Sequence, residues 1–347
     1  MRVNREELLK RLEAVSAGLA KREIIEQSQC FVFQKGRIVT FNDEVAAWTD
    51  DPLEGIVDAV EESSGTDGFA IPAAPLLALL QKLPEDELDV AIVDGGLSVK
   101  GKGRRATIRM ETEVLLPVDG VEDPGDWVKL PNGMLDAMKV AMSCCSGDES
   151  HFLLTCVHIA SDRVESSDDF QILVYPIKTR LKKPTLLRRD SVAKLVQTDP
   201  TEWSETDGWL HFRNPSGLVL SCRRYMEDYP DVGKFLDVEG SKAKFPKGID
   251  EALDKANIFS AENPVGNQVT VSLSPGRLRL EGKGPSGRYE ERKRVDYDGE
   301  ALSFAIEPKL LLEISQRSNE CIVGDGRIKV DAGKFSYVAC TAPAEEE

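Results

Sequence analysis

Apolar residues recur at helical spacing in six short segments of the chain. In the first segment, Leu8, Leu12 and Val15 are three or four positions apart, which places them on one side of a helix. Asn4 with Glu7 matches a capping box at its start. Four later segments are entered through a residue followed by proline, which suits a first helical turn. The pattern predicts helices over residues 4–19, 72–83, 131–142, 188–196, 246–258 and 307–317.

Between these helices the pattern changes to alternation of apolar and polar residues, which is typical of half-buried strands. Glycine-rich and proline-rich turn signals separate the alternating runs. Each helix is therefore followed by several antiparallel strands. The alternating runs cover residues 29–40, 89–99, 152–160, 218–224, 269–280 and 327–330.

The helices begin at intervals of roughly 60 residues, which is an internal structural repeat. Two such repeats make up about a third of the 347 residues. We therefore predict an α+β fold of three repeated domains, each with two helices on antiparallel sheets. The predicted domains are residues 1–117, 118–237 and 238–347, with linkers at 117–126 and 237–244.

The composition is that of a protein with packed cores. Hydrophobic residues make up 41% of the chain, yet no apolar run reaches the roughly 20 residues of a membrane span. The N-terminus has no signal-peptide core. We expect a soluble, cytoplasmic protein with no membrane contact.

Cysteine and histidine usage gives no sign of a metal or cofactor site. Seven cysteines are an odd number without a C-x-x-C pair, so neither a zinc site nor a disulfide framework is expected. Cys30, Cys156, Cys222 and Cys340 lie in strand-like segments, where buried thiols are the favoured interpretation. The three histidines lie in apolar or strand contexts, where packing outweighs metal binding. We expect no cofactor.

The net charge of −16 argues against a simple DNA-binding domain, because phosphate neutralisation usually requires a basic protein. Acidity is compatible with DNA binding only if the basic groups are segregated onto one surface. A ring that encloses DNA satisfies this condition, since enclosure replaces tight binding.

Three motifs that could carry catalysis have simpler interpretations. The segment from Gly282 to Gly287 matches the G-x-G-x-x-G dinucleotide motif, but no helix follows it, so a hairpin turn is favoured. The segment from Gly96 to Gly103 resembles a phosphate-binding loop but lacks its final Ser or Thr. Asp168 and Asp169 could hold a metal in a hydrolase or nuclease, although most such pairs lie in solvated turns.

Several segments, in chain order, resemble the bacterial DNA polymerase III beta subunit, the sliding clamp. Residues 249–263 resemble the helix that opens the third domain of clamps, and 304–314 resemble their last helix. Residues 334–338 resemble their final strand. Residues 225–236, with Tyr229-Pro230-Asp231, resemble the family's Phe-Pro-Asp-Tyr loop. Residues 166–174 resemble its Ala-Thr-Asp-Gly-His-Arg-Leu-Ala-Val hairpin.

The resemblance implies a DNA clamp fold that forms a ring on dimerisation. Such a clamp is not an enzyme. It encircles double-stranded DNA without reading its sequence, is placed there by a clamp loader, and tethers DNA polymerase during replication. Basic residues on helices or at their ends are expected to face the DNA. The residues chosen for this role are Arg22, Lys139, Arg189 and Lys194.

In this family, partners insert a short peptide between the second and third domains. Here Phe170 and Gln171 stand where His and Arg are usual, which favours a diverged clamp, such as one of a phage serving its own polymerase. The alternative is that these residues only seal the domain junction. The residues that correspond to the family's pocket are Leu154, Ser167, Asp169, Phe170, Gln171, Ile172, Pro230, Lys234, Phe235, Val338, Ala339 and Cys340.

The resemblance also implies a homodimer in which the first domain of one copy meets the third domain of another. Ala106 and Ile108 would face Ile258 and Phe259 across this seam. Two other interpretations stay open. One is a β-rich protein-binding or peptide-binding module that does not encircle DNA, and the other is the carboxylate-based hydrolase.

Overall fold

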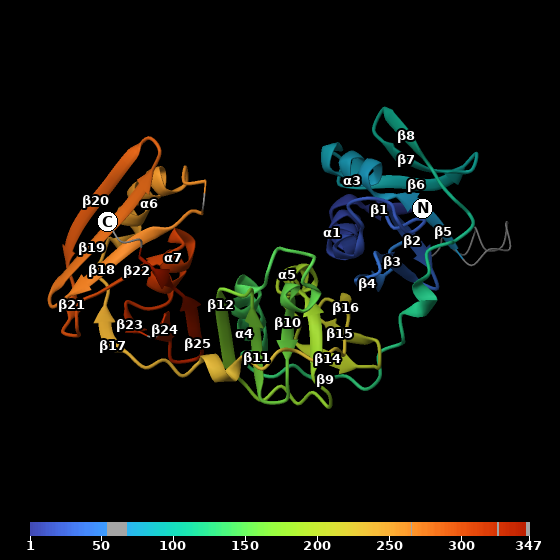
Figure 1. Cartoon of the computed structure of the whole chain (residues 1–347). Coiled ribbons are helices and arrows are strands. Elements are labelled where there is room, and N and C mark those ends of the chain that lie inside the picture. Colours follow the sequence, from blue (N-terminus) through green and yellow to red (C-terminus); the bar gives the residue numbers. More distant parts are fainter. Residues whose placement is uncertain (54–67, 265, 325, 345–347) are drawn as a thin grey trace. The chain divides into compact units, whose positions relative to one another are not determined.

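The computed structural model describes residues 1–53, 68–264, 266–324 and 326–344 and contains two compact units (Figure 1). Unit 1 comprises Met1–Leu135 and Thr185–Met226, and unit 2 comprises Asp136–Pro184 and Glu227–Glu347. Each unit combines part of the predicted second domain with one of its neighbours. The boundaries of the three predicted domains therefore stay a prediction.

All six predicted helices are present. Leu8, Leu12 and Val15 are buried on one face of the first helix, and Asn4 caps it by accepting a hydrogen bond from the Glu7 amide at 2.9 Å. The helices are α1 (Arg5–Val15), α3 (Ala73–Lys82), α4 (Met134–Ala141), α5 (Arg189–Leu195), α6 (Ile249–Ser260) and α7 (Pro308–Arg317).

Two helices begin three residues later than their prolines predict. Gly133 and Gly248 follow Pro131 and Pro246 by two positions and have φ values of 83° and 77°. A left-handed backbone cannot be part of a right-handed helix. The helix therefore starts after the glycine in both cases, whereas Pro308 occupies the first turn of α7 as predicted.

Unit 1 contains two antiparallel sheets. In the larger sheet, β4 pairs with β16, so strands from the first and second predicted domains share one sheet. Its order is β5 (Gly68–Pro72), β2 (Cys30–Gln34), β3 (Arg37–Phe41), β4 (Val45–Asp50), β16 (Val219–Arg223), β15 (Trp209–Arg213), β14 (Glu202–Glu205) and β9 (Val128–Lys129). The smaller sheet runs β1 (Arg2–Asn4), β6 (Glu87–Val93), β7 (Gly96–Gly101) and β8 (Arg104–Arg109).

Unit 2 also contains two antiparallel sheets. In the first, β12 pairs with β25, which joins strands of the second and third predicted domains. This sheet runs β10 (Cys156–Ile159), β11 (Arg163–Ser167), β12 (Gln171–Pro176), β25 (Ser336–Cys340), β24 (Arg327–Asp331), β23 (Glu320–Gly324), β17 (Ser241–Lys244) and β21 (Asp296–Tyr297). The second runs β20 (Gly287–Arg294), β19 (Arg277–Gly284), β18 (Val269–Ser274), β22 (Leu302–Ile306) and β26 (Ala342–Pro343).

Both glycine-rich decoys are hairpin turns, as predicted. β19 and β20 pair up to Gly284 and Gly287, and β7 pairs with β8 up to Gly101 and Arg104. The prediction for Cys340 is wrong: its thiol is free and exposed, whereas the other cysteines are buried. Cys340 is the last residue of β25, beyond the part of the strand that the core covers.

Candidate functional site

A cavity of about 540 Å³ lies in unit 2, where β12 begins and β25 ends. The structure brings ten of the twelve residues predicted for the peptide pocket to its wall. They come from four separate segments of the chain. The ten are Leu154, Ser167, Asp169, Phe170, Gln171, Ile172, Pro230, Phe235, Val338 and Cys340.

The β11–β12 hairpin turn forms one side of the cavity. The Asp168 carboxylate accepts hydrogen bonds from the amides of Phe170 and Gln171, at 3.2 and 3.1 Å, and from the Gln171 side chain at 2.7 Å. Asp169 has a φ of 75°, which the tight turn requires. These bonds fix the turn and leave the Phe170 ring 62% exposed at the cavity rim.

The segment before η5 (Gly233–Phe235) forms the opposite side. The Tyr229 ring stacks on His158 at 4.8 Å between ring centroids, and His158 is held by Glu165 at 2.6 Å. Burial raises the pKa of the Tyr229 hydroxyl well above its usual range. Tyr229 is thus a neutral anchor that fixes the position of its neighbour Pro230 in the wall.

Two predicted pocket residues do not lie on the wall. Ala339 is fully buried because side chains alternate along a strand, so it points away from the side of Val338 and Cys340. Lys234 is exposed beside the cavity, with its ammonium 5.0 Å from the centre of the Phe235 ring.

Sequence reasoning missed five wall residues. Phe152 and Leu153 belong to an apolar run that ends at the predicted Leu154, so the run itself was a usable signal. Arg327 lies on the wall because it pairs with Cys340 across β24 and β25, a register that the local sequence does not reveal. Its guanidinium donates to the Phe235 carbonyl at 3.1 Å. The five are His151, Phe152, Leu153, Val232 and Arg327.

The cavity has the chemistry of a binding site for a short peptide. Most of its wall is apolar, and His151, Asp169 and Arg327 are its ionisable side groups besides the Cys340 thiol. Burial raises the pKa of that thiol, so it is a neutral wall group. Apolar anchors with a few polar groups suit the capture of apolar side chains from a flexible partner.

The carboxylates that could have formed a metal site have other roles. Asp168 is occupied by the hydrogen bonds of its own turn. Within the residues that the structure describes, no group of three or more His, Cys, Asp or Glu could hold a metal ion. No helix in the described ranges is long and apolar enough to cross a bilayer.

The residues predicted to face DNA differ in their exposure. Lys139 on α4 and Arg189 on α5 are exposed, and Arg22 is exposed in the segment between α1 and β2. Lys194 is half-buried on α5, and burial lowers the pKa of its ammonium group. The described helices carry nearly equal numbers of acidic and basic residues, so they do not form a strongly basic surface.

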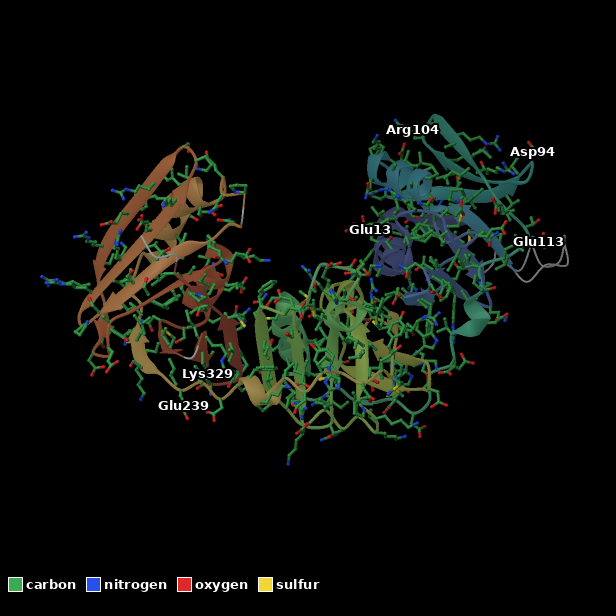
Figure 2. All side chains as sticks on the ribbon, viewed as in Figure 1. Glu13, Asp94, Arg104, Glu113, Glu239 and Lys329 are labelled. Carbon is green, nitrogen blue, oxygen red and sulfur yellow. The ribbon has the colours of Figure 1, made fainter. Side chains whose placement is uncertain are left out.

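The residues predicted for the dimer seam lie on sheet edges or beside them. Ala106 and Ile108 are on β8, an edge strand of unit 1, which begins at Arg104 (Figure 2). Ala106 is half-buried and Ile108 is buried. In unit 2, Ile258 and Phe259 are on α6, and 65% of Ile258 is exposed. Phe259 packs beside Gly287, the first residue of edge strand β20.

The fold of the chain is that of the sliding clamps of DNA polymerase III. A clamp from Pseudomonas aeruginosa matches with a TM-score of 0.79 and 16% identity over 99% of both chains. The beta subunit from Thermotoga maritima matches with a TM-score of 0.80 and 16% identity, again over 99% of both chains. A clamp from Bartonella birtlesii, solved with griselimycin, gives 0.84 and 15% over 99% of both.

Comparison at the level of sequence adds no relative. No protein-family model matches the chain, and a search of curated proteins finds no significant match.

Proposed function

We propose that this protein is a sliding clamp, a ring that encloses duplex DNA and tethers a polymerase, and that it acts without catalysis. The observation that carries the proposal is the correspondence of its fold to sliding clamps over 99% of both chains. A fold alone does not define a function. The cavity in unit 2 adds a site with the chemistry that partner binding needs.

The cavity is the proposed docking site for partner peptides, including one from the polymerase. Phe170 at its rim and Ile172 and Val338 in its wall would receive apolar side chains. The alternative that these residues only seal the junction of β12 and β25 leaves an exposed phenylalanine without a role. Large apolar groups at the centre of a polar rim are typical of binding sites.

Ring closure is proposed to join the β8 edge of one copy to the β20 edge of another, with Ala106 and Ile108 near Ile258 and Phe259. Both strands end their sheets and so leave one row of backbone groups unpaired, which favours pairing with another chain. The exposed side chain of Ile258 would be buried at this homodimer seam.

DNA contacts in the ring are proposed to be few and weak. Arg22, Lys139 and Arg189 are exposed and can contact phosphates, whereas the half-buried Lys194 is the least suited of the four. Acidic residues on the same helices reduce the attraction. Such a surface holds DNA by enclosure and lets the protein slide.

The proposal is tested by loading the protein with a clamp loader onto nicked circular DNA and then cutting that DNA once. We expect the protein to stay on the intact circle and to leave the linear form through its ends. Equal retention on both forms would contradict a clamp. It would favour the second candidate, a peptide-binding module that does not encircle DNA, because the cavity belongs to unit 2 alone.

A further inference from the structure

The sheet formed by β18, β19, β20 and β22 has one open face. Gly282 of β19 lies directly against the backbone of Ala256 on α6, so the residues that alternate with it, Leu278 and Leu280, face the helix and are buried. Side chains at the intervening positions point to the opposite face. Figure 2 shows nitrogen-tipped side chains projecting from this hairpin on the side away from α6.

The open face carries opposed pairs of cations. In the β19–β20 register, Arg277 lies opposite Arg294 and Arg279 lies opposite Arg292. Lys283 lies opposite Arg288 near the turn. We call these six cations the basic face. Like charges directly opposite each other on a sheet are destabilising, and the chain as a whole has a charge of −16.

Neighbouring carboxylates neutralise only the middle of the basic face. Glu290 accepts hydrogen bonds from Arg279 at 2.9 Å and from Arg292 at 2.8 Å, and Glu281 accepts one from Arg279 at 2.6 Å. Arg277 and Arg294 have no carboxylate partner among the residues described. An arrangement that opposes folding is expected where a ligand compensates for it, and here the ligand must be an anion.

Hydroxyl groups lie beside the arginines. A shallow depression of about 710 Å³ is lined by Ser272, Ser274 and Ser303 together with four arginines of the basic face. Guanidinium forks and hydroxyls are the side chains that contact phosphate oxygens. The open sheet offers no apolar anchor for a peptide, and Tyr289 belongs to the alternate positions that face α6, so no aromatic ring is present to stack on a base.

We propose that the basic face binds the phosphate backbone of duplex DNA, without sequence preference and outside the ring. This site lies on the face of its sheet opposite α6, and binding there requires no enclosure.

The test uses a short linear duplex whose two ends are blocked with streptavidin before the protein is added, so that threading cannot occur. We compare the parent protein with a double variant, Arg277→Gln with Arg294→Gln, and a control, Lys129→Gln with Lys242→Gln. The control removes the same charge from exposed positions off this face. Affinity is measured by fluorescence anisotropy as a function of salt concentration.

The double variant is expected to bind at least about tenfold more weakly at low salt, and its salt dependence should fall by about 0.9 per lost phosphate contact. The control should match the parent. Equal binding by the parent and the double variant would overturn the proposal. Poly-glutamate binding as tightly as the duplex would also overturn it, in favour of an acidic protein partner.

A folding control is built into the same face. Arg294→Glu places a carboxylate opposite Arg277, which should leave the urea midpoint equal to or above that of the parent, while DNA binding is lost. A failure of the duplex to bind leaves retention on circular DNA unaffected, so the two proposals fail independently.

Discussion

Phe170 is the single side chain that best represents the proposed site. Its ring is 62% exposed at the rim of the cavity, while the Asp168 hydrogen bonds fix the turn beneath it. The resemblance to clamps identified this turn because its residues are contiguous in sequence. It could not identify Arg327, which reaches the cavity through pairing with a distant strand. It also placed Ala339 on the wrong side of its strand.

Truncation of Phe170 should separate binding from folding. Phe170→Ala removes an exposed ring, so stability should change little. Its affinity for griselimycin, which is bound by clamps of this fold, should fall at least about tenfold if the ring is an anchor. Calorimetry measures the affinity, and Ile24→Ala, at a residue 92% exposed in unit 1, is the control. Unchanged affinity would remove Phe170 from the site.

His211 gives unit 1 a defined response to pH. Burial lowers the pKa of its imidazole to about 4, below the usual value of about 6.5 in an unfolded chain. Unfolding therefore takes up a proton between these values, and stability falls as the pH drops through this window. We expect unit 1 to lose about 2 kcal/mol between pH 7 and pH 4.5.

The measurement is urea unfolding followed by tryptophan fluorescence. All four tryptophans, Trp48, Trp127, Trp203 and Trp209, belong to unit 1. His211→Gln removes the titrating group and should flatten this part of the pH dependence. A parent and a variant that lose stability equally would show that other groups govern it.

At the scale of elements, the helices were predictable because their signal is local. The spacing of Leu8, Leu12 and Val15 is visible in the sequence, and the same holds for the other helices. Two starts were misplaced because a left-handed glycine at 133 or 248 outweighs the preceding proline. The pairings of β4 with β16 and of β12 with β25 join distant segments, and no local pattern specifies such partners.

The edge elements carry the prediction on assembly. Ile258→Lys places a charge on the exposed part of α6, where the partner's β8 would bring Arg104 and Arg105 close in the proposed seam. Loss of a buried isoleucine costs about 2 kcal/mol, so the Kd of the dimer should rise at least about tenfold. Analytical ultracentrifugation measures it. Ile24→Lys, also at an exposed isoleucine, should dimerise like the parent.

At the scale of the whole molecule, charge and fold point to enclosure rather than tight binding. A chain with a charge of −16 and helices of mixed charge has no broad surface for strong contact with the outside of a duplex. Sequence periodicity predicted the number of helices and their spacing. Closure into a ring depends on a second copy, which no pattern within one chain can establish.

Topological trapping tests enclosure most directly, without a loader. The protein is incubated with a linear duplex, both ends are then blocked with streptavidin, and the complex is washed at high salt, which removes contacts that depend on phosphate charge. We predict that protein remains on the blocked duplex and is released when a restriction enzyme cuts it in the middle. Complete loss in the wash, or retention that persists after the cut, would contradict a sliding clamp.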